Sequence, residues 1–136
     1  AEAKGAILGL TRDTSKKHIA RACLDGMALS INDSIKAITS DSPNEVLDIR
    51  VDGGASQNNL LMQIQANFSC KRIIRPMIIE TTAYGVALGS LVGLGEIDFD
   101  KIESLWNEEK SFDPKDETYF TKKSSQWDQL VKKLYL

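Results

Sequence analysis

The fold is decided by residues 46–59, which read VLDIRVDGGASQNN. The first part, residues 46–51, alternates in part between apolar and polar side chains and contains β-branched residues, so it predicts a β-strand. This strand ends in the pair Gly53-Gly54, and an apolar pattern with helical spacing follows as far as Phe68. The stretch therefore predicts a strand, a tight glycine turn and a helix in direct succession.

The predicted turn has the chemistry of a place where an anion approaches the main chain. Two glycines leave no Cβ between a ligand and the backbone, and the start of a helix offers unpaired N–H groups and a partial positive charge. Asn58 and Asn59 fall in the first turn of the helix, where a side-chain amide can reach a base or a ribose. A purely structural turn before an Asn-capped helix has the same pattern. The residues alone leave both interpretations open.

Upstream of this stretch, the pattern predicts one strand and one long helix. Residues 6–10 are apolar and predict a buried strand. The capping side chains at 13–15 begin an amphipathic helix with a narrow stripe of apolar and small residues, and residues 40–43 end it. Cys23 falls on that stripe, so we expect it to be a small core residue.

Downstream, residues 71–75 predict a short strand closed by Pro76, and a helix begins after Glu80 and extends to about Leu94. This alternation of strands and helices favours an α/β layered fold with a largely parallel sheet. The three expected strands are fewer than the roughly 5 or 6 of an average sheet, so we expect further strands upstream of Ala1.

The sequence becomes more polar from Glu96 onward. Apolar residues between 99 and 106 predict a short helix, and residues 112–114 predict an extended break. The spacing of aromatic and aliphatic residues between 119 and 134 predicts a terminal helix that docks on the body. Residues 96–136 are therefore expected to form a tail.

Composition excludes several classes of protein. The chain has 136 residues, enough for one domain with a core, and its net charge is −2 with both signs interspersed. A nucleic-acid surface or a membrane-binding face is therefore not expected. The longest stretch of small and apolar residues, 83–94, is too short to span a bilayer.

Cysteine and histidine content narrows the chemistry further. Cys23 and Cys70 lie far apart and have no metal-ligand spacing, which favours a reducing, cytoplasmic location over a disulfide framework. His18 is the single histidine, which excludes a multi-histidine metal site, and we expect it to serve a surface or capping role. The sequence also has no Walker-type phosphate loop, so a bound nucleotide would need another architecture.

Several motifs, in register over residues 5–114, resemble the FGGY family of carbohydrate kinases, and its glycerol kinase branch in particular. They are Gly5-x-Ile7-x-Gly9-Leu10-Thr11-Arg12, His18-Ile19-x-x-Ala22-Cys23-Leu24-Asp25, Arg50-Val51-Asp52-Gly53-Gly54-Ala55-x-x-Asn58-Asn59-x-Leu61-Met62-Gln63-x-Gln65-Ala66, Arg75-Pro76, Glu80-Thr81-Thr82-Ala83-x-Gly85-x-Ala87 and Phe112-x-Pro114.

The resemblance implies an α/β fold, a partial ribonuclease H-like (actin-like ATPase) domain in three layers with a few strands flanked by helices. Residues 1–136 would be the C-terminal segment of the nucleotide-binding domain. It also implies that Gly53, Gly54, Ala55 and Asn58 bind the nucleotide. In the family the backbone at Gly54 lies against the phosphates, and Asn58 borders the base and ribose. No catalytic residue and no metal ligand is expected in this chain, because the family's catalytic aspartate and polyol site belong to segments upstream of Ala1.

The implied activity is that of an ATP-dependent kinase that uses Mg2+ and moves the γ-phosphoryl group of ATP to glycerol. ATP, ADP and glycerol are the expected partners, and a homo-oligomer is expected as well. The chain alone is expected to be inactive. Two alternatives remain open: another FGGY kinase acting on xylulose or gluconate, or a non-catalytic interaction module on the same fold.

Two residues depart from the family pattern. Cys23 stands where Ala, Ser, Thr or an aliphatic residue is usual, and Asn67 stands where glycerol kinases usually carry Asp. The second change leaves open whether nucleotide affinity or only helix packing is affected. Among nearby polar residues, Asp52 is expected to cap the glycine turn rather than to assist magnesium, Arg12 to be a structural charge, and Gln63 and Gln65 to serve packing.

Overall fold

The computed structural model describes residues 5–115 and 117–135. Its helices and strands are α1 (Lys16–Asp41), β1 (Asp48–Arg50), α2 (Asn59–Ser69), β2 (Arg72–Pro76), α3 (Thr81–Gly93), β3 (Glu108–Phe112) and α4 (Glu117–Tyr135). Three short 3-10 helices, η1 (Gly54–Gln57), η2 (Phe99–Lys101) and η3 (Glu103–Leu105), lie in the connections.

The three strands form one mixed sheet in the order β1-β2-β3. β1 and β2 are parallel, with Ile49 opposite Ile73, whereas β2 and β3 are antiparallel, with Ile74 opposite Ser111. A crossover through α2 joins the two parallel strands, as parallel pairing requires. The sheet brings the start of α2 beside the end of β2, which is where the glycine turn lies.

The core lies around α2, which packs against β2 and β3 on one side and against α1 and α4 on the others. Ile64 of α2 is 1% exposed and Ile73 of β2 is 0% exposed. Phe120 of α4 meets Phe68 of α2 edge to face, with ring centroids 4.8 Å apart. The α4 helix is also tied to α1, because Trp127 donates a hydrogen bond from Nε1 to Asp33 Oδ2 at 2.7 Å.

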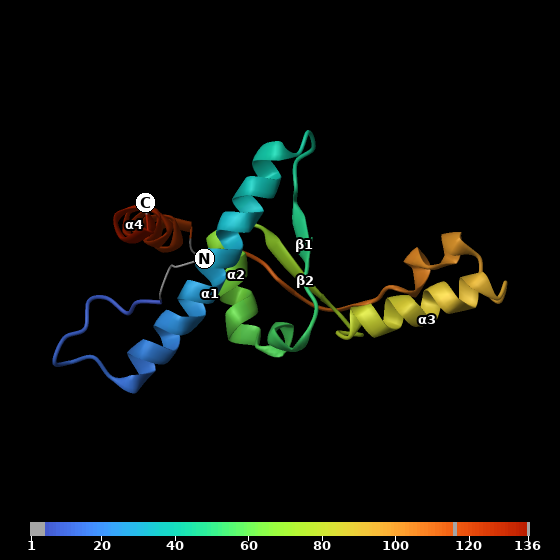
Figure 1. Cartoon of the computed structure of the whole chain (residues 1–136), viewed down its shortest axis with the longest axis horizontal. Coiled ribbons are helices and arrows are strands. Elements are labelled where there is room, and N and C mark those ends of the chain that lie inside the picture. The colour runs from blue at the N-terminus through green and yellow to red at the C-terminus, as the bar shows by residue number, and fades with distance from the viewer. Residues whose placement is uncertain (1–4, 116, 136) are drawn as a thin grey trace.

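The α3 helix and the connection after it project from this core. Figure 1 shows them extending on the side opposite α4. Leu88 is the one α3 residue that is buried, whereas Val86 is 68% exposed and Leu94, just after the helix, is 75% exposed. We refer to residues 81–106 as the α3 arm.

Most of the expected elements are present. The long helix is α1, the strand before the glycines is β1, the strand ending at Pro76 is β2, and the helix after Glu80 is α3. The terminal helix is α4, and it packs on α2. No helix among the described residues has the length and apolar character that crossing a membrane requires.

The strand expected at residues 6–10 is wrong. These residues have no regular secondary structure, and Ile7, Leu8 and Leu10 are exposed. A strand is stable only through hydrogen bonds to a neighbour, and within the described part of the chain the sheet contains only β1, β2 and β3. The largely parallel sheet was also wrong, because β3 pairs antiparallel to β2.

Three further expectations need correction. Residues 99–106 form the short η2 and η3 rather than one helix, and the residues before the expected break at 112–114 are strand β3. Cys23 is exposed rather than buried, because the buried side of α1 is centred on Ala28, Leu29 and Asn32.

Candidate nucleotide site at the diglycine turn

Gly53 gives the turn after β1 a conformation that only glycine adopts readily. Its φ is 75° and its ψ is 173°, in the region of positive φ that side chains with a Cβ avoid. The Gly53 N–H donates to the carbonyl of Ile79 at 2.9 Å, which fixes the turn to the connection after β2. A Cβ placed on Gly53 or Gly54 would meet no other atom within 4 Å, so the turn is open on its outer side.

The main chain after Gly53 presents free amide groups. Ser56 N–H and Asn58 N–H donate to the carbonyls of Gly53 and Ala55. The N–H groups of Gly54 and Ala55 have no acceptor among the described residues, and both residues are exposed. Two neighbouring unpaired N–H groups in a short turn can both donate hydrogen bonds to one anionic oxygen.

Asn58 caps α2. Its Oδ1 accepts hydrogen bonds from the N–H groups of Leu60 and Leu61, each at 3.1 Å. This satisfies two of the orphan donors at the helix start. The N–H of Asn59, the first residue of α2, has no acceptor among the described residues. The Asn58 side chain is exposed, and its NH2 group has no partner in the part of the chain that is described.

The four residues predicted from the sequence, Gly53, Gly54, Ala55 and Asn58, thus lie together at one open turn. The structural interpretation of Asn58 as a helix cap is correct, and it leaves the amide nitrogen available. Their contact with a nucleotide stays a prediction.

The sequence predicted that Asp52 caps the glycine turn, and this prediction is wrong. Its Oδ2 accepts a hydrogen bond from the hydroxyl of Thr81, at the start of α3. The carboxylate therefore ties the turn to the α3 arm. Among the described residues no group of three or more His, Cys, Asp or Glu side chains is arranged to hold a metal ion.

Arg75 is the residue at this site that sequence reasoning missed. It lies on β2, is 5% exposed, and its Nη1 donates to the Ser56 carbonyl at 2.6 Å and to Asn59 Oδ1 at 3.0 Å. Its Nε and Nη2 donate to the two carboxylate oxygens of Glu109 on β3 at 2.6 and 3.2 Å. A charged residue inside the apolar strand sequence RIIRP was the available signal.

The polar residues further along α2 serve packing, as expected for Gln63. Gln63 Nε2 donates to the Asp113 carbonyl at 2.7 Å and to Asn67 Oδ1 at 3.1 Å, and Lys115 N–H donates to the same Asn67 oxygen at 2.9 Å. Asn67 therefore anchors the segment between β3 and α4, away from the glycine turn. Gln65 is buried, and its side-chain amide has no partner among the described residues.

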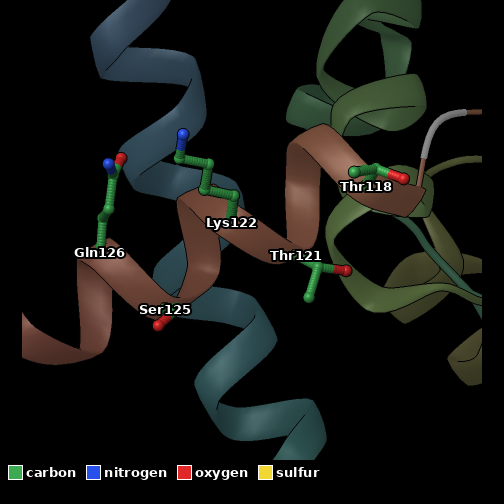
Figure 2. Close-up of a pocket in the computed structure, with 5 residues that line it drawn as sticks. All are labelled: Thr118, Thr121, Lys122, Ser125 and Gln126. Atoms are coloured by element: carbon green, nitrogen blue, oxygen red, sulfur yellow. The ribbon is translucent and has the colours of Figure 1, made fainter.

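The other residues considered from the sequence, His18 and Arg12, have no contacts that indicate catalysis or ligand binding. His18 is exposed, and its Nδ1 accepts a hydrogen bond from Ser15 N–H at 3.1 Å, which confirms the capping role. Arg12 is exposed, and its side chain has no ion pair with the described residues. A shallow hollow along α4, shown in Figure 2, is lined by five residues of polar type: Thr118, Thr121, Lys122, Ser125 and Gln126. All five lie on one face of a single helix, so they enclose no ligand.

Comparison with known proteins identifies the family. Residues 1–94 match the C-terminal domain of the FGGY family of carbohydrate kinases. The chain belongs to this family. Glycerol kinase 2 of Sulfolobus acidocaldarius is 40% identical to it over 133 residues, which are 96% of this chain and 27% of the relative. Glycerol kinase of Rhodopirellula baltica is 45% identical over 116 residues, which are 84% of this chain and 21% of the relative.

Solved structures confirm the fold of this FGGY chain. The crystal structure of Plasmodium falciparum glycerol kinase with ADP superposes with a TM-score of 0.85 and 30% identity. The superposition covers 99% of this chain and 28% of that one. The expected partial actin-like ATPase domain is therefore correct. The FGGY chain spans about a quarter of the length of the relatives it matches.

Proposed function

We propose that this chain is the C-terminal part of a glycerol kinase and that it supplies the adenosine side of the ATP site. The observation that carries the proposal is the open diglycine turn with two free amides. It is supported by the 40 to 45% identity with glycerol kinases and by the ADP named for the solved relative. The complete enzyme would transfer the γ-phosphoryl group of ATP to glycerol and give glycerol 3-phosphate.

In this proposal each site residue has a distinct role. Gly53 and Gly54 let the phosphates approach the main chain, and the Gly54 and Ala55 N–H groups donate to phosphate oxygens. The free NH2 group of Asn58 donates to the base or ribose while its oxygen holds the start of α2. Phosphoryl transfer depends on positioning and charge stabilisation, and this chain contributes positioning.

The catalytic aspartate and the glycerol contacts come from the part of the fold upstream of this chain. Mg2+ would accompany ATP in the complete enzyme. The described residues offer no cluster of ligands for it. The chain alone is accordingly expected to have no kinase activity.

A chimaera tests the function. The matching C-terminal part of the Sulfolobus acidocaldarius glycerol kinase 2 is replaced by this chain, and ATP-dependent phosphorylation of glycerol, xylulose and gluconate is measured. We expect activity with glycerol. A folded chimaera that is inactive contradicts the proposal, whereas its preference among the three acceptors reports on the upstream part that the Sulfolobus acidocaldarius enzyme supplies.

Nuclear magnetic resonance of the chain alone tests the site and does not depend on the chimaera folding. Addition of ADP at millimolar concentration is expected to shift the amide signals of Gly53, Gly54, Ala55 and Asn58. Gly54→Val should weaken these shifts at least tenfold, because its methyl groups cover the free amides while the open space leaves the fold intact. Gly89→Val, on α3, is the matched control. Shifts that are absent from the turn, or equal in both variants, contradict the assigned site.

We further propose that the complete protein is a cytoplasmic homo-oligomer and that residues 96–136 form a tail of the nucleotide-binding domain. The apolar side chains that the described residues leave exposed are consistent with contacts to further protein, which include the rest of this fold as well as a second copy. Analytical ultracentrifugation measures the oligomeric state, and a monomer at micromolar concentration contradicts this proposal.

A further inference from the structure

The diglycine turn is held in place from inside the protein by one side chain. The Ser56 carbonyl belongs to η1 and Asn59 begins α2, and both accept hydrogen bonds from Nη1 of Arg75. The free amides of Gly54 and Ala55 lie just before Ser56. The position of those amides therefore depends on a residue of β2, 16 or more positions later in the chain.

Arg75 is itself held rigidly. Glu109 of β3 accepts from Nε and Nη2 through both carboxylate oxygens, a bidentate pairing that fixes the plane of the guanidinium group. Four hydrogen bonds occupy four of the five N–H groups of an arginine. The guanidinium carbon also lies 5.6 Å from the centre of the Phe112 ring.

These contacts allow Arg75 to hold the turn in position but leave it unable to contact a nucleotide directly. The Arg75 side chain is 6% exposed and its charge is paired with Glu109, so it offers neither surface nor free charge to a phosphate. It contacts the back of the turn, and the free amides are on the exposed front.

We propose that Arg75 is a positioning residue for nucleotide binding. Through Ser56 and Asn59 it sets the direction of the Gly54 and Ala55 amides, and Glu109 orients it. This inference rests on the proposed function for the nucleotide, whereas the hold of Arg75 on the turn is a property of the chain alone.

Arg72 provides a matched control. It lies on the same strand and also pairs with a glutamate of β3, because its Nη2 lies 3.3 Å from Glu108 Oε1. Its other side-chain contacts are with Ser111 and Asp113. Arg72→Ala therefore removes an arginine–glutamate pair from β2 and leaves the turn untouched.

The experiment compares R75A with R72A in the 136-residue chain. Hydrogen exchange at the Ser56 and Asn58 amides, both bonded inside the turn, is expected to accelerate about tenfold in R75A, because a buried carbonyl loses its charged donor. R72A should leave this exchange within about twofold of the parent. The dissociation constant for ADP, from the amide shifts, should rise about tenfold in R75A alone.

Lysine at the same position covers the case in which R75A does not fold. Lysine keeps the charge and lacks the planar fork that joins Ser56, Asn59 and Glu109, so R75K is expected to accelerate exchange in the turn relative to R72K. Equal exchange in the two members of either pair overturns the positioning role. Faster exchange with unchanged ADP affinity also overturns it, whereas absence of ADP shifts in the parent chain contradicts the proposed function instead.

Discussion

The α2–β2 core and the α3 arm are both apolar in sequence, yet they have opposite environments. Ile64 and Ile73 of the core are 1% and 0% exposed, whereas Val86 and Leu94 of the arm are 68% and 75% exposed. The α2 helix has α1, α4 and the sheet around it. An apolar segment is therefore buried only where other helices or strands pack against it.

The largest expected effect follows directly from this difference. Ile73→Ala should lower the free energy of unfolding by about 2–5 kcal/mol, because it leaves a cavity in packed surroundings. Val86→Ala on the arm should change it by less than about 0.5 kcal/mol. Urea unfolding followed by circular dichroism measures both values. Similar values for the two variants would remove the distinction between core and arm.

Asn67 lies at the polar edge of the core, and its substitution tests how much its hydrogen bonds contribute to stability. Asn67→Leu leaves Gln63 Nε2 with one acceptor fewer and Lys115 N–H without one, so we expect a loss of about 1–3 kcal/mol. Asn67→Asp keeps the accepting oxygen and should cost less than half as much, with ADP affinity unchanged. Urea unfolding and amide shifts provide the two measurements. A change in ADP affinity in Asn67→Asp would assign the residue to the nucleotide site.

Asn58 lies where the core meets the open turn, and two variants separate its roles. Asn58→Ala removes the cap from α2 and should cost about 1 kcal/mol of stability. Asn58→Asp keeps the capping oxygen and replaces the free NH2 group, so it should retain stability and weaken ADP binding. Thermal unfolding and ADP titration of both variants check this. Normal ADP binding by Asn58→Asp excludes the base or ribose contact.

The smallest effect on stability is expected at the end of the arm. Leu94→Gln should change the free energy of unfolding by less than about 0.5 kcal/mol, because Leu94 is exposed. It should nevertheless reduce self-association if the arm is a contact surface. Sedimentation velocity at several concentrations compares it with the parent chain. Unchanged association places the contact elsewhere.

Much of this fold follows from local patterns, and the errors have a common physical cause. The helical spacing in α1 and the glycines after β1 specify their elements without help from distant residues. Residues 6–10 have a strand pattern, but no described strand pairs with them. Conversely, β3 reads EEKSF, which has no apolar alternation, and it is a strand because β2 bonds to it. Pairing partners far along the chain decided both cases.

The residues of the site also differ in whether their roles depend on local sequence or on distant partners. The glycine pair and Asn58 were recognisable because their roles are local: a positive φ at Gly53 and a cap at the start of α2. Arg75 was not, because its importance comes from Ser56 and Glu109, which lie 19 residues before it and 34 residues after it. No spacing rule along the sequence connects these three residues.

The position of β3 and α4 has a consequence for where this domain can be divided. Residues 1–94 carry the match to the family, but the sheet takes its third strand from residues 108–112, and the core includes Phe112 and Phe120. A polypeptide cut after residue 94 would expose one edge of β2 and remove the carboxylate that orients Arg75. The end of the match to the family's C-terminal domain is therefore not the boundary of the cooperative folding unit.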